Sequence, residues 1–234
     1  MGIKASLSFL FAKFVVRRNN KWKNNALKAQ SDLMISLVEK AQNTTFGKDH
    51  HFSTITTYSD FKNQIPIRNY EDIKGYIEQI MEGRKGVLWP GKPIYFCKTA
   101  GTTSGSKYLP ITKESMPHQI AAARDAILSY IAETKNTSIV NGKMIFLQGS
   151  PELYKIGDIL TGRLSGIVAH HIPVYLTKNR LPSFETNCIA DWDEKVSAIV
   201  EETLSEKMTL ISGIPPWVQM YFEKLQKKTG KLIK

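Results

Sequence analysis

Apolar residues recur at helical spacing near the start of the chain. Between Leu7 and Val15 five of them follow the i, i+3, i+4, i+7, i+8 pattern, which predicts an amphipathic helix over residues 6–18 that packs on its own domain. A basic helix on a membrane surface and a cleaved presequence are the alternatives. The same spacing predicts a helix over residues 25–42. Further predicted helices cover residues 59–63, 71–82 and 115–133, and two more begin at Asp191 and near Pro215.

Short β-prone runs alternate with these helices. They cover residues 94–98, 108–112, 143–147, 167–176 and 208–212. The run at 143–147 is mostly apolar and bounded by glycines, which indicates a buried strand of a parallel sheet. This alternation predicts an α/β fold with a mixed, largely parallel sheet and flanking helices. We expect residues 1–44 to form a helical lead-in and residues 45–234 to form the α/β core.

A hydroxyl-rich glycine loop separates the predicted strands 94–98 and 108–112. Gly101 and Gly105 allow positive φ angles, so backbone N–H groups and neighbouring hydroxyls can converge on one anion, and Lys107 adds a positive charge. A Walker A loop is excluded because Lys107 does not directly follow the glycine, and the Rossmann glycine spacing is absent. An ordinary surface turn without a ligand is the alternative. The candidate phosphate-binding residues are Thr99, Ala100, Gly101, Thr102, Thr103, Ser104, Gly105 and Lys107.

Short motifs in a fixed order extend over nearly the whole chain. They are TFG (45–47), FSTI (52–55), YSDFK (58–62), IPI (65–67), YEDIK (70–74), LWPG (88–91), PITK (110–113), DWDEK (191–195) and ISGIPPW (211–217). Together with the loop, they resemble the amino-terminal part of the auxin-responsive Gretchen Hagen family of acyl acid amido synthetases. That family is similar in fold and chemistry to acyl-CoA synthetases and firefly luciferase. The loop resembles the one with which adenylate-forming enzymes hold the β- and γ-phosphates of ATP, although Thr99 and Ala100 stand where the family has two serines.

The resemblance implies a ligase that uses ATP and Mg²⁺, and the low cysteine content fits a reducing cytoplasm. A carboxylic acid attacks the α-phosphate, pyrophosphate leaves, and an amino acid or another amine then takes the acyl group. The partners are therefore small molecules. In the resembling family the helix after the loop lines the substrate site, so His118 in its first turn is a candidate substrate contact. The alternative is a stand-alone ligand-binding or interaction domain without catalysis.

The resemblance also implies that several nucleotide-binding and catalytic motifs of the family are not among residues 1–234. The family's adenine- and Mg²⁺-binding motif, its ribose-binding aspartate and its mobile carboxy-terminal domain would all follow Lys234. We therefore expect residues 1–234 to be a truncated amino-terminal domain of the adenylate-forming fold, with catalytic residues unknown and no complete turnover. Residues 154–158 imitate the ribose-binding signature, with Lys155 for arginine, but they come too early. We interpret them and the glycine-rich stretch that follows as a loop.

Positive charge gathers at the two ends of the chain. Of the formal net charge of +11, residues 1–31 carry seven basic and no acidic side chains, and residues 223–234 carry five lysines and one glutamate. This pattern indicates solvated helix faces rather than a nucleic-acid-binding surface. Lys13 interrupts the first apolar stretch, so no integral membrane segment is expected. Cys97 and Cys188 provide neither a disulfide framework nor the spacing of a metal site. Of the adjacent histidines at 170–171, one is expected to form a hydrogen bond with a backbone group.

Overall fold

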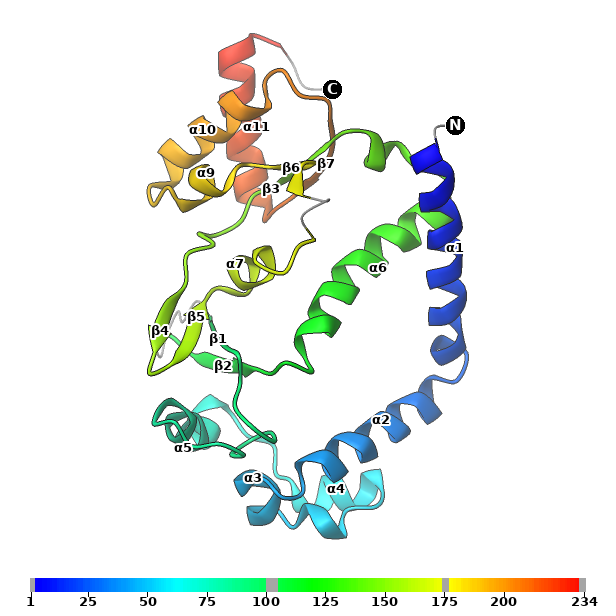
Figure 1. The fold of residues 1–234 in the computed structure, drawn as a ribbon, viewed down its shortest axis with the longest axis vertical. Coiled ribbons are helices and arrows are strands. Elements are labelled where there is room, and N and C mark those ends of the chain that lie inside the picture. The colour runs from blue at the N-terminus through cyan, green and yellow to red at the C-terminus, as the bar shows by residue number, and fades with distance from the viewer. Residues whose placement is uncertain (1–2, 100–104, 174–176, 232–234) are drawn as a thin grey trace. The chain divides into compact units, whose positions relative to one another are not determined.

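The computed structural model describes residues 3–99, 105–173 and 177–231. The chain folds into two compact units (Figure 1). We call one the hairpin unit, which comprises Arg17–Gln119 and Leu153–Gly162. The other is the parallel-sheet unit, which comprises Met1–Val16, Ile120–Glu152 and Arg163–Lys234. Each unit is therefore assembled from segments that are separate in the sequence.

The hairpin unit combines helices with a four-stranded sheet in the order β2-β1-β5-β4. β1 (Tyr95–Lys98) pairs antiparallel with β2 (Tyr108–Ile111) and parallel with β5 (Ile159–Gly162). β4 (Tyr154–Ile156) is antiparallel to β5. The helices are α2 (Ala26–Ala41), α3 (Thr45–Asp49), the 3-10 helix η1 (Phe52–Thr54), α4 (Tyr58–Gln64) and α5 (Tyr70–Met81).

The parallel-sheet unit is built on a three-stranded sheet in the order β6-β3-β7, in which both pairings are parallel. Its strands are β3 (Lys143–Phe146), β6 (Arg180–Leu181) and β7 (Met208–Ser212). Its shorter helices are the 3-10 helix η2 (Ser138–Asn141), α7 (Leu164–Ala169) and α9 (Phe184–Cys188). The longer ones are α10 (Trp192–Thr203) and α11 (Pro215–Thr229). Two further helices, α1 (Ile3–Lys23) and α6 (Met116–Thr134), contribute residues to both units, because the unit boundaries fall inside them.

Each unit has its own apolar core. In the hairpin unit, Phe96 of β1 is fully buried in a cluster with Ile77 and Ile80 of α5. In the parallel-sheet unit, Ile145 of β3 packs in a cluster with Ile199 of α10.

The sequence predictions of helices over 25–42, 59–63, 71–82 and 115–133 are confirmed, as are the strands at 94–98, 108–112, 143–147 and 208–212. The expectation of an α/β fold with a mixed sheet and flanking helices is therefore confirmed.

Side-chain caps explain where several helices begin. The hydroxyl of Thr57 accepts a hydrogen bond from the Asp60 N–H at 3.2 Å, and the Asp60 carboxylate accepts one from the Thr57 N–H at 2.8 Å. This reciprocal capping box satisfies backbone donors that the first helical turn of α4 leaves unpaired. Hydrogen bonds from Thr57 and Thr56 hold the pKa of Asp60 below its usual value. Asp191 caps α10 as the sequence predicts, accepting from the Glu194 N–H at 2.8 Å.

The apolar stripe predicted to face inward on the first helix is mostly exposed. In α1 the buried residues are Ala5, Ala12 and Val15, and α1 joins α6 in one apolar cluster. Small side chains allow two helices to approach closely, which is why the alanine face makes this contact. Four apolar residues that the prediction placed inside, Leu7, Leu10, Phe11 and Phe14, are 61%, 63%, 47% and 62% exposed. That part of the prediction is therefore wrong.

Two sequence predictions between residues 154 and 176 are also wrong. The expected loop at 154–166 contains the β4–β5 hairpin, which turns at Gly157 with a φ of 60°. The expected strand at 167–176 begins inside helix α7, and residues 174–176 lie outside the described part of the chain. A short apolar run is equally compatible with a buried helix and a strand, and here the helix brings Gly166 against the backbone of Ser150. The expected backbone partner of one histidine is confirmed, because His170 Nε2 lies 2.8 Å from the Pro151 carbonyl oxygen.

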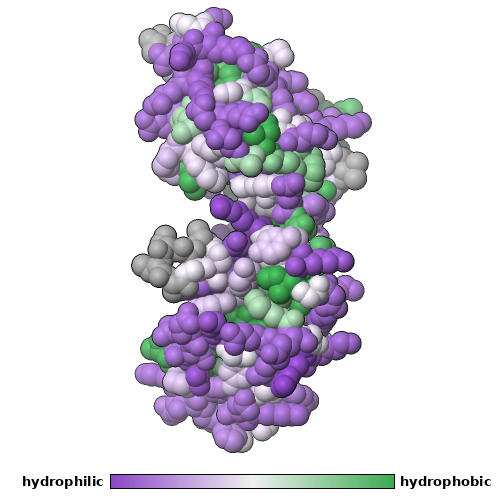
Figure 2. Space-filling model, turned by 90° about the vertical axis from the view of Figure 1, so that its left-hand side faces the viewer, coloured by the Kyte–Doolittle hydropathy of each residue, from purple (hydrophilic) through white to green (hydrophobic). Residues whose placement is uncertain are grey.

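One face of the molecule shows how polar and apolar side chains are distributed over its surface (Figure 2). On the face drawn in Figure 2, hydrophilic side chains predominate and hydrophobic ones occur in small separate groups. Scattered apolar side chains of this kind are ordinary on folded proteins. Among the helices of the described segments, none combines the length and the apolar composition needed to cross a bilayer.

We predict opposite effects on stability when two helical glycines are replaced by alanine. A Cβ atom at Gly47 would lie 2.1 Å from the Ala41 carbonyl oxygen, so Gly47→Ala forces the junction of α2 and α3 apart. We expect this variant to lose about 2 kcal/mol of unfolding free energy. The matched control is Gly75→Ala in α5, where a Cβ meets nothing within 4 Å and helix propensity should add about 0.5–1 kcal/mol. Urea unfolding followed by circular dichroism measures both, and equal stabilities for the two variants would contradict the close contact at Gly47.

Candidate functional site

The candidate phosphate loop is the connection of a β-hairpin in the hairpin unit. β1 and β2 pair from Tyr95 with Ile111 to Lys98 with Tyr108. Just beyond the last pair, the Thr99 N–H donates a hydrogen bond to the Lys107 carbonyl oxygen at 2.9 Å. The two ends of the loop are therefore held together by the hairpin ladder.

Three of the candidate phosphate-binding residues lie in the described part of the chain. They are Thr99, Gly105 and Lys107. Gly105 has a φ of 82°, the left-handed conformation that was expected of a glycine in this loop. The other five candidates, Ala100, Gly101, Thr102, Thr103 and Ser104, lie outside the described residues, so the role of the loop stays a prediction.

Lys107 places a positive charge at the exit of the loop. Its side chain is half-buried, and its Nζ lies 5.6 Å from the centroid of the Tyr70 ring. Within the described segments, no carboxylate forms an ion pair with Lys107. Its charge is therefore not neutralised by a described acidic side chain and can interact with an anion.

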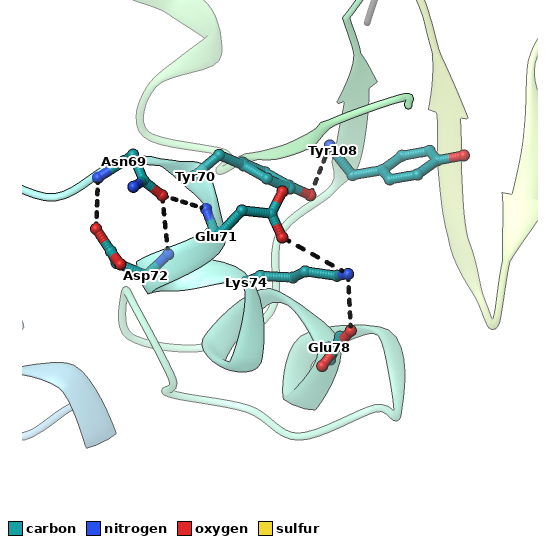
Figure 3. Close-up of polar contacts among 7 residues, drawn as sticks. All are labelled: Asn69, Tyr70, Glu71, Asp72, Lys74, Glu78 and Tyr108. Atoms are coloured by element: carbon teal, nitrogen blue, oxygen red, sulfur yellow. Dashed lines mark hydrogen bonds and ion pairs between the residues drawn. The ribbon is translucent and has the colours of Figure 1, made fainter. Parts of the chain in front are cut away.

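Tyr70, the first residue of α5, contacts the backbone next to Lys107. The Tyr108 N–H donates a hydrogen bond to the Tyr70 hydroxyl oxygen at 3.0 Å (Figure 3). α5 itself begins with a capping box, in which Asn69 Oδ1 accepts from the Asp72 N–H at 3.2 Å and the Asp72 carboxylate accepts from the Asn69 N–H at 2.8 Å. The start of α5 and the start of β2 are thus joined by one side chain.

Further aromatic rings lie next to Tyr108 at the loop exit. The Tyr108 and Phe96 rings meet edge to face, with centroids 6.4 Å apart. Burial, together with a hydrogen bond to Tyr108, raises the pKa of Tyr154 to about 12. Both effects favour the neutral phenol, so Tyr154 carries no negative charge near neutral pH.

His118 lies in a pocket of the hairpin unit. The pocket has a volume of about 370 Å³ and is walled mainly by apolar side chains from α2, the turn at 87–91 and β2, among them Leu37, Trp89 and Pro110. Thr112 and Ser115 exchange hydrogen bonds between backbone N–H and side-chain oxygen at 3.1 Å and 3.0 Å, which orders the entry to α6 next to His118. A pocket of this size with a few polar groups is typical of small-molecule sites.

A second pocket, of about 310 Å³, lies in the parallel-sheet unit at the carboxyl ends of β3 and β7. Phe146, Ser212 and Trp217 line it together with Arg163. A Cβ at Gly149 would lie 2.8 Å from Arg163 Cδ, so the glycine leaves the space that the arginine stem occupies. In open α/β sheets, ligands bind outside the carboxyl ends of parallel strands. Arg163 was not among the residues predicted from the sequence, although the glycines on either side of it, Gly162 and Gly166, indicate close packing.

The imitation of a ribose-binding signature at residues 154–158 has another explanation. The Asp158 carboxylate forms an ion pair with Lys92, which holds its pKa below the usual value. Across the described ranges, no group of three or more histidine, cysteine, aspartate or glutamate side chains is arranged to hold a metal ion.

Comparison with known proteins places the chain in a family. The model of the GH3 family N-terminal domain matches residues 15–195. Jasmonoyl-L-amino acid synthetase JAR6 from Nicotiana attenuata is 26% identical over 141 residues, which are 59% of this chain and 24% of that protein. The probable indole-3-acetic acid-amido synthetase GH3.13 from Oryza sativa subsp. japonica is 41% identical over 58 residues, 24% of this chain and 12% of the relative.

Solved structures share the fold. The structure of the AtGH3.15 acyl acid amido synthetase in complex with 2,4-DB matches with a TM-score of 0.75 at 15% identity, covering 92% of this chain and 38% of that one. A second GH3.15 structure matches with a TM-score of 0.67, over 93% of this chain and 41% of its own. The chain thus spans well under half the length of the proteins it matches, and the resemblance to the Gretchen Hagen family is confirmed. This chain belongs to the GH3 family and has the mixed α/β fold of its amino-terminal domain.

Proposed function

We propose that the chain forms part of an ATP-dependent acyl acid amido synthetase and that its hairpin loop binds the phosphates of ATP. The observation that carries this proposal is the pairing of Thr99 with Lys107, which closes a glycine-containing loop and leaves a cation without a described acidic partner at its exit. The names of the relatives, a jasmonoyl-L-amino acid synthetase and two amido synthetases, support the reaction class.

The chemistry assigns a defined role to the loop. When a carboxylate attacks the α-phosphate of ATP, negative charge moves onto the departing pyrophosphate. Backbone N–H groups and an ammonium group held in place before the reaction stabilise that charge without reorganising. Gly105, with its positive φ, lets the backbone approach the phosphates, and Lys107 supplies the positive charge. The described residues therefore fit the terminal phosphates of ATP.

Mg²⁺ fits the described residues less well. Mg²⁺ prefers carboxylate and phosphate oxygens, and within the described ranges no cluster of acidic side chains is arranged to bind it. We therefore assign no step to a metal ligand of this chain. In this proposal, Mg²⁺ enters with the nucleotide phosphates.

The acid and the amine are proposed to be small molecules, as the names of the relatives suggest. We place the acid in the pocket of the hairpin unit, where apolar walls suit a hydrocarbon body and His118 can donate a hydrogen bond to a carboxylate. The pocket at the ends of β3 and β7 is the competing location. We also propose a cytoplasmic location, since a sequence with two cysteines and no disulfide framework fits a reducing compartment.

We predict that Lys107→Ala weakens binding of ATP and of pyrophosphate about tenfold, because a charge-assisted hydrogen bond to phosphate is lost. Isothermal titration calorimetry at low salt measures the effect. The matched control is Lys113→Ala, which removes an exposed lysine at the opposite end of β2 and should leave the affinity unchanged. If ATP neither binds nor raises the unfolding midpoint of the unsubstituted chain, the alternative of a ligand-binding or interaction domain without catalysis replaces this proposal.

For the acid we predict that His118→Ala weakens binding of indole-3-acetic or jasmonic acid about tenfold, whereas Arg163→Ala changes it by less than about twofold. Both side chains line pockets, so each variant is the control for the other. Quenching of tryptophan fluorescence gives the affinities. The reverse order of effects would move the acid to the carboxyl ends of β3 and β7.

A third prediction concerns turnover. We expect the purified chain of 234 residues, mixed with ATP, Mg²⁺, an acid and an amino acid, to form no amide and release no AMP, because it covers 38% of the amido synthetase chain that it matches. Chromatography of the nucleotides and mass spectrometry of the products measure this, with a complete amido synthetase as positive control. Amide formation by the chain alone would overturn this part of the proposal.

A further inference from the structure

One tyrosine contacts both the backbone and the charge at the exit of the hairpin loop. The Tyr70 hydroxyl accepts the hydrogen bond from the Tyr108 N–H at 3.0 Å (Figure 3). The ring of the same residue lies 5.6 Å from Lys107 Nζ, within the distance of about 6 Å over which a cation is attracted to an aromatic face. The two contacts involve consecutive residues of the loop exit.

The position of Tyr70 is set by α5 rather than by the loop. As the first helical residue, it directly follows Asn69, whose side chain bonds the N–H groups of Glu71 and Asp72. The far part of α5 is anchored by Ile77 and Ile80, which are 1% and 3% exposed in the core of the hairpin unit. The Tyr70 backbone is therefore held in place before any ligand arrives.

An aromatic ring is better suited than a carboxylate to hold the Lys107 ammonium group in place for an anion. A lysine side chain has four rotatable bonds, and ordering it on binding costs conformational entropy. An acidic partner would order the ammonium group but would also compete with phosphate for it. A neutral ring orders the cation and leaves its charge available to an anion.

We propose that Tyr70 is a positioning residue that holds the Lys107 ammonium group ready for the terminal phosphates of a nucleoside triphosphate. The ring positions the charge, and the bond to the Tyr108 N–H fixes the backbone from which that charge projects. This inference rests on the proposed phosphate-binding function of the loop.

Tyr58 provides a matched control in the same unit. It is the first residue of α4 and also follows a capping box, formed by Thr57 and Asp60. Its side chain is 66% exposed, and within the described segments the ring that lies over the Lys107 ammonium group is that of Tyr70, not of Tyr58. Substitution of Tyr58 therefore changes the same residue type at the same helical position without touching the loop exit.

The first experiment tests the position of the cation without any ligand. Lysine amines are labelled by reductive ¹³C-methylation, which keeps their charge, and the Lys107 signal is assigned with Lys107→Arg. We expect an upfield ring-current shift of this signal in the unsubstituted chain and in Tyr70→Phe. The shift should disappear in Tyr70→Leu and Tyr70→Met and remain in Tyr58→Leu. An unshifted Lys107 signal in the unsubstituted chain, or a shift that survives in both Tyr70→Leu and Tyr70→Met, overturns the inference whatever the loop binds.

The second experiment tests the consequence with inorganic pyrophosphate as the probe. By calorimetry, we expect Tyr70→Leu to weaken binding about fivefold and Tyr58→Leu to leave it unchanged. Tyr70→Phe keeps the ring but loses the bond to the Tyr108 N–H, so we expect a smaller loss of about twofold. In a Lys107→Ala background, Tyr70→Leu should cause no further loss, because it acts through Lys107. An equal loss in both backgrounds would show a merely structural role and overturn the inference. A ring-current shift without any pyrophosphate binding would instead overturn the phosphate-loop proposal, and with it the positioning role of Tyr70 toward phosphate.

Discussion

The hairpin unit depends on the burial of one short strand that is paired along both edges. β1 hydrogen-bonds to β2 on one side and to β5 on the other, and Phe96 at its centre is fully buried. A strand held in this way cannot shift its register without exposing the core side of the sheet. Its last residue, and with it the start of the loop, is therefore fixed in space. A loop whose ends are held loses less conformational freedom when it closes on an anion.

Much of the fold could be predicted from the sequence because its signals are local. Asp191 with Glu194 and Pro215 at a helix start act within one helical turn, and the structure has helices where they indicate them. The wrong predictions concern contacts between segments that are separate in the sequence. Residues 164–169 form a helix in which Gly166 packs against the backbone of Ser150, and no local pattern records this contact between separate segments. The exposed stripe of α1 has the same cause, since spacing shows that a face is apolar but not which face finds a partner.

The candidate site, too, has features that the sequence could indicate and others that it could not. Glycines, hydroxyls and a following lysine between two strands are local, so the sequence could indicate a phosphate loop and the positive φ of Gly105. Tyr70 could not be found by such reasoning, because it precedes Tyr108 by a long stretch and meets it only through the packing of α5 beside the sheet. Asp158 shows that a local signature can also mislead. Its sequence context imitates a nucleotide-binding signature, yet in the structure its carboxylate forms an ion pair with Lys92.

The discontinuous make-up of the hairpin unit bears on how the protein acquires its structure. Tyr95 of β1 pairs with Leu160 of β5, and the segment that supplies β4 and β5 is enclosed in sequence by parts of the parallel-sheet unit. During synthesis, β1 and β2 can form their hairpin early, but the parallel edge of β1 stays open until β5 has left the ribosome. Such non-local parallel pairing is slow to form. While residues 99–158 are being added, the nascent chain thus carries an unpaired strand edge next to the candidate phosphate loop, and an unpaired edge of this kind can pair with another chain.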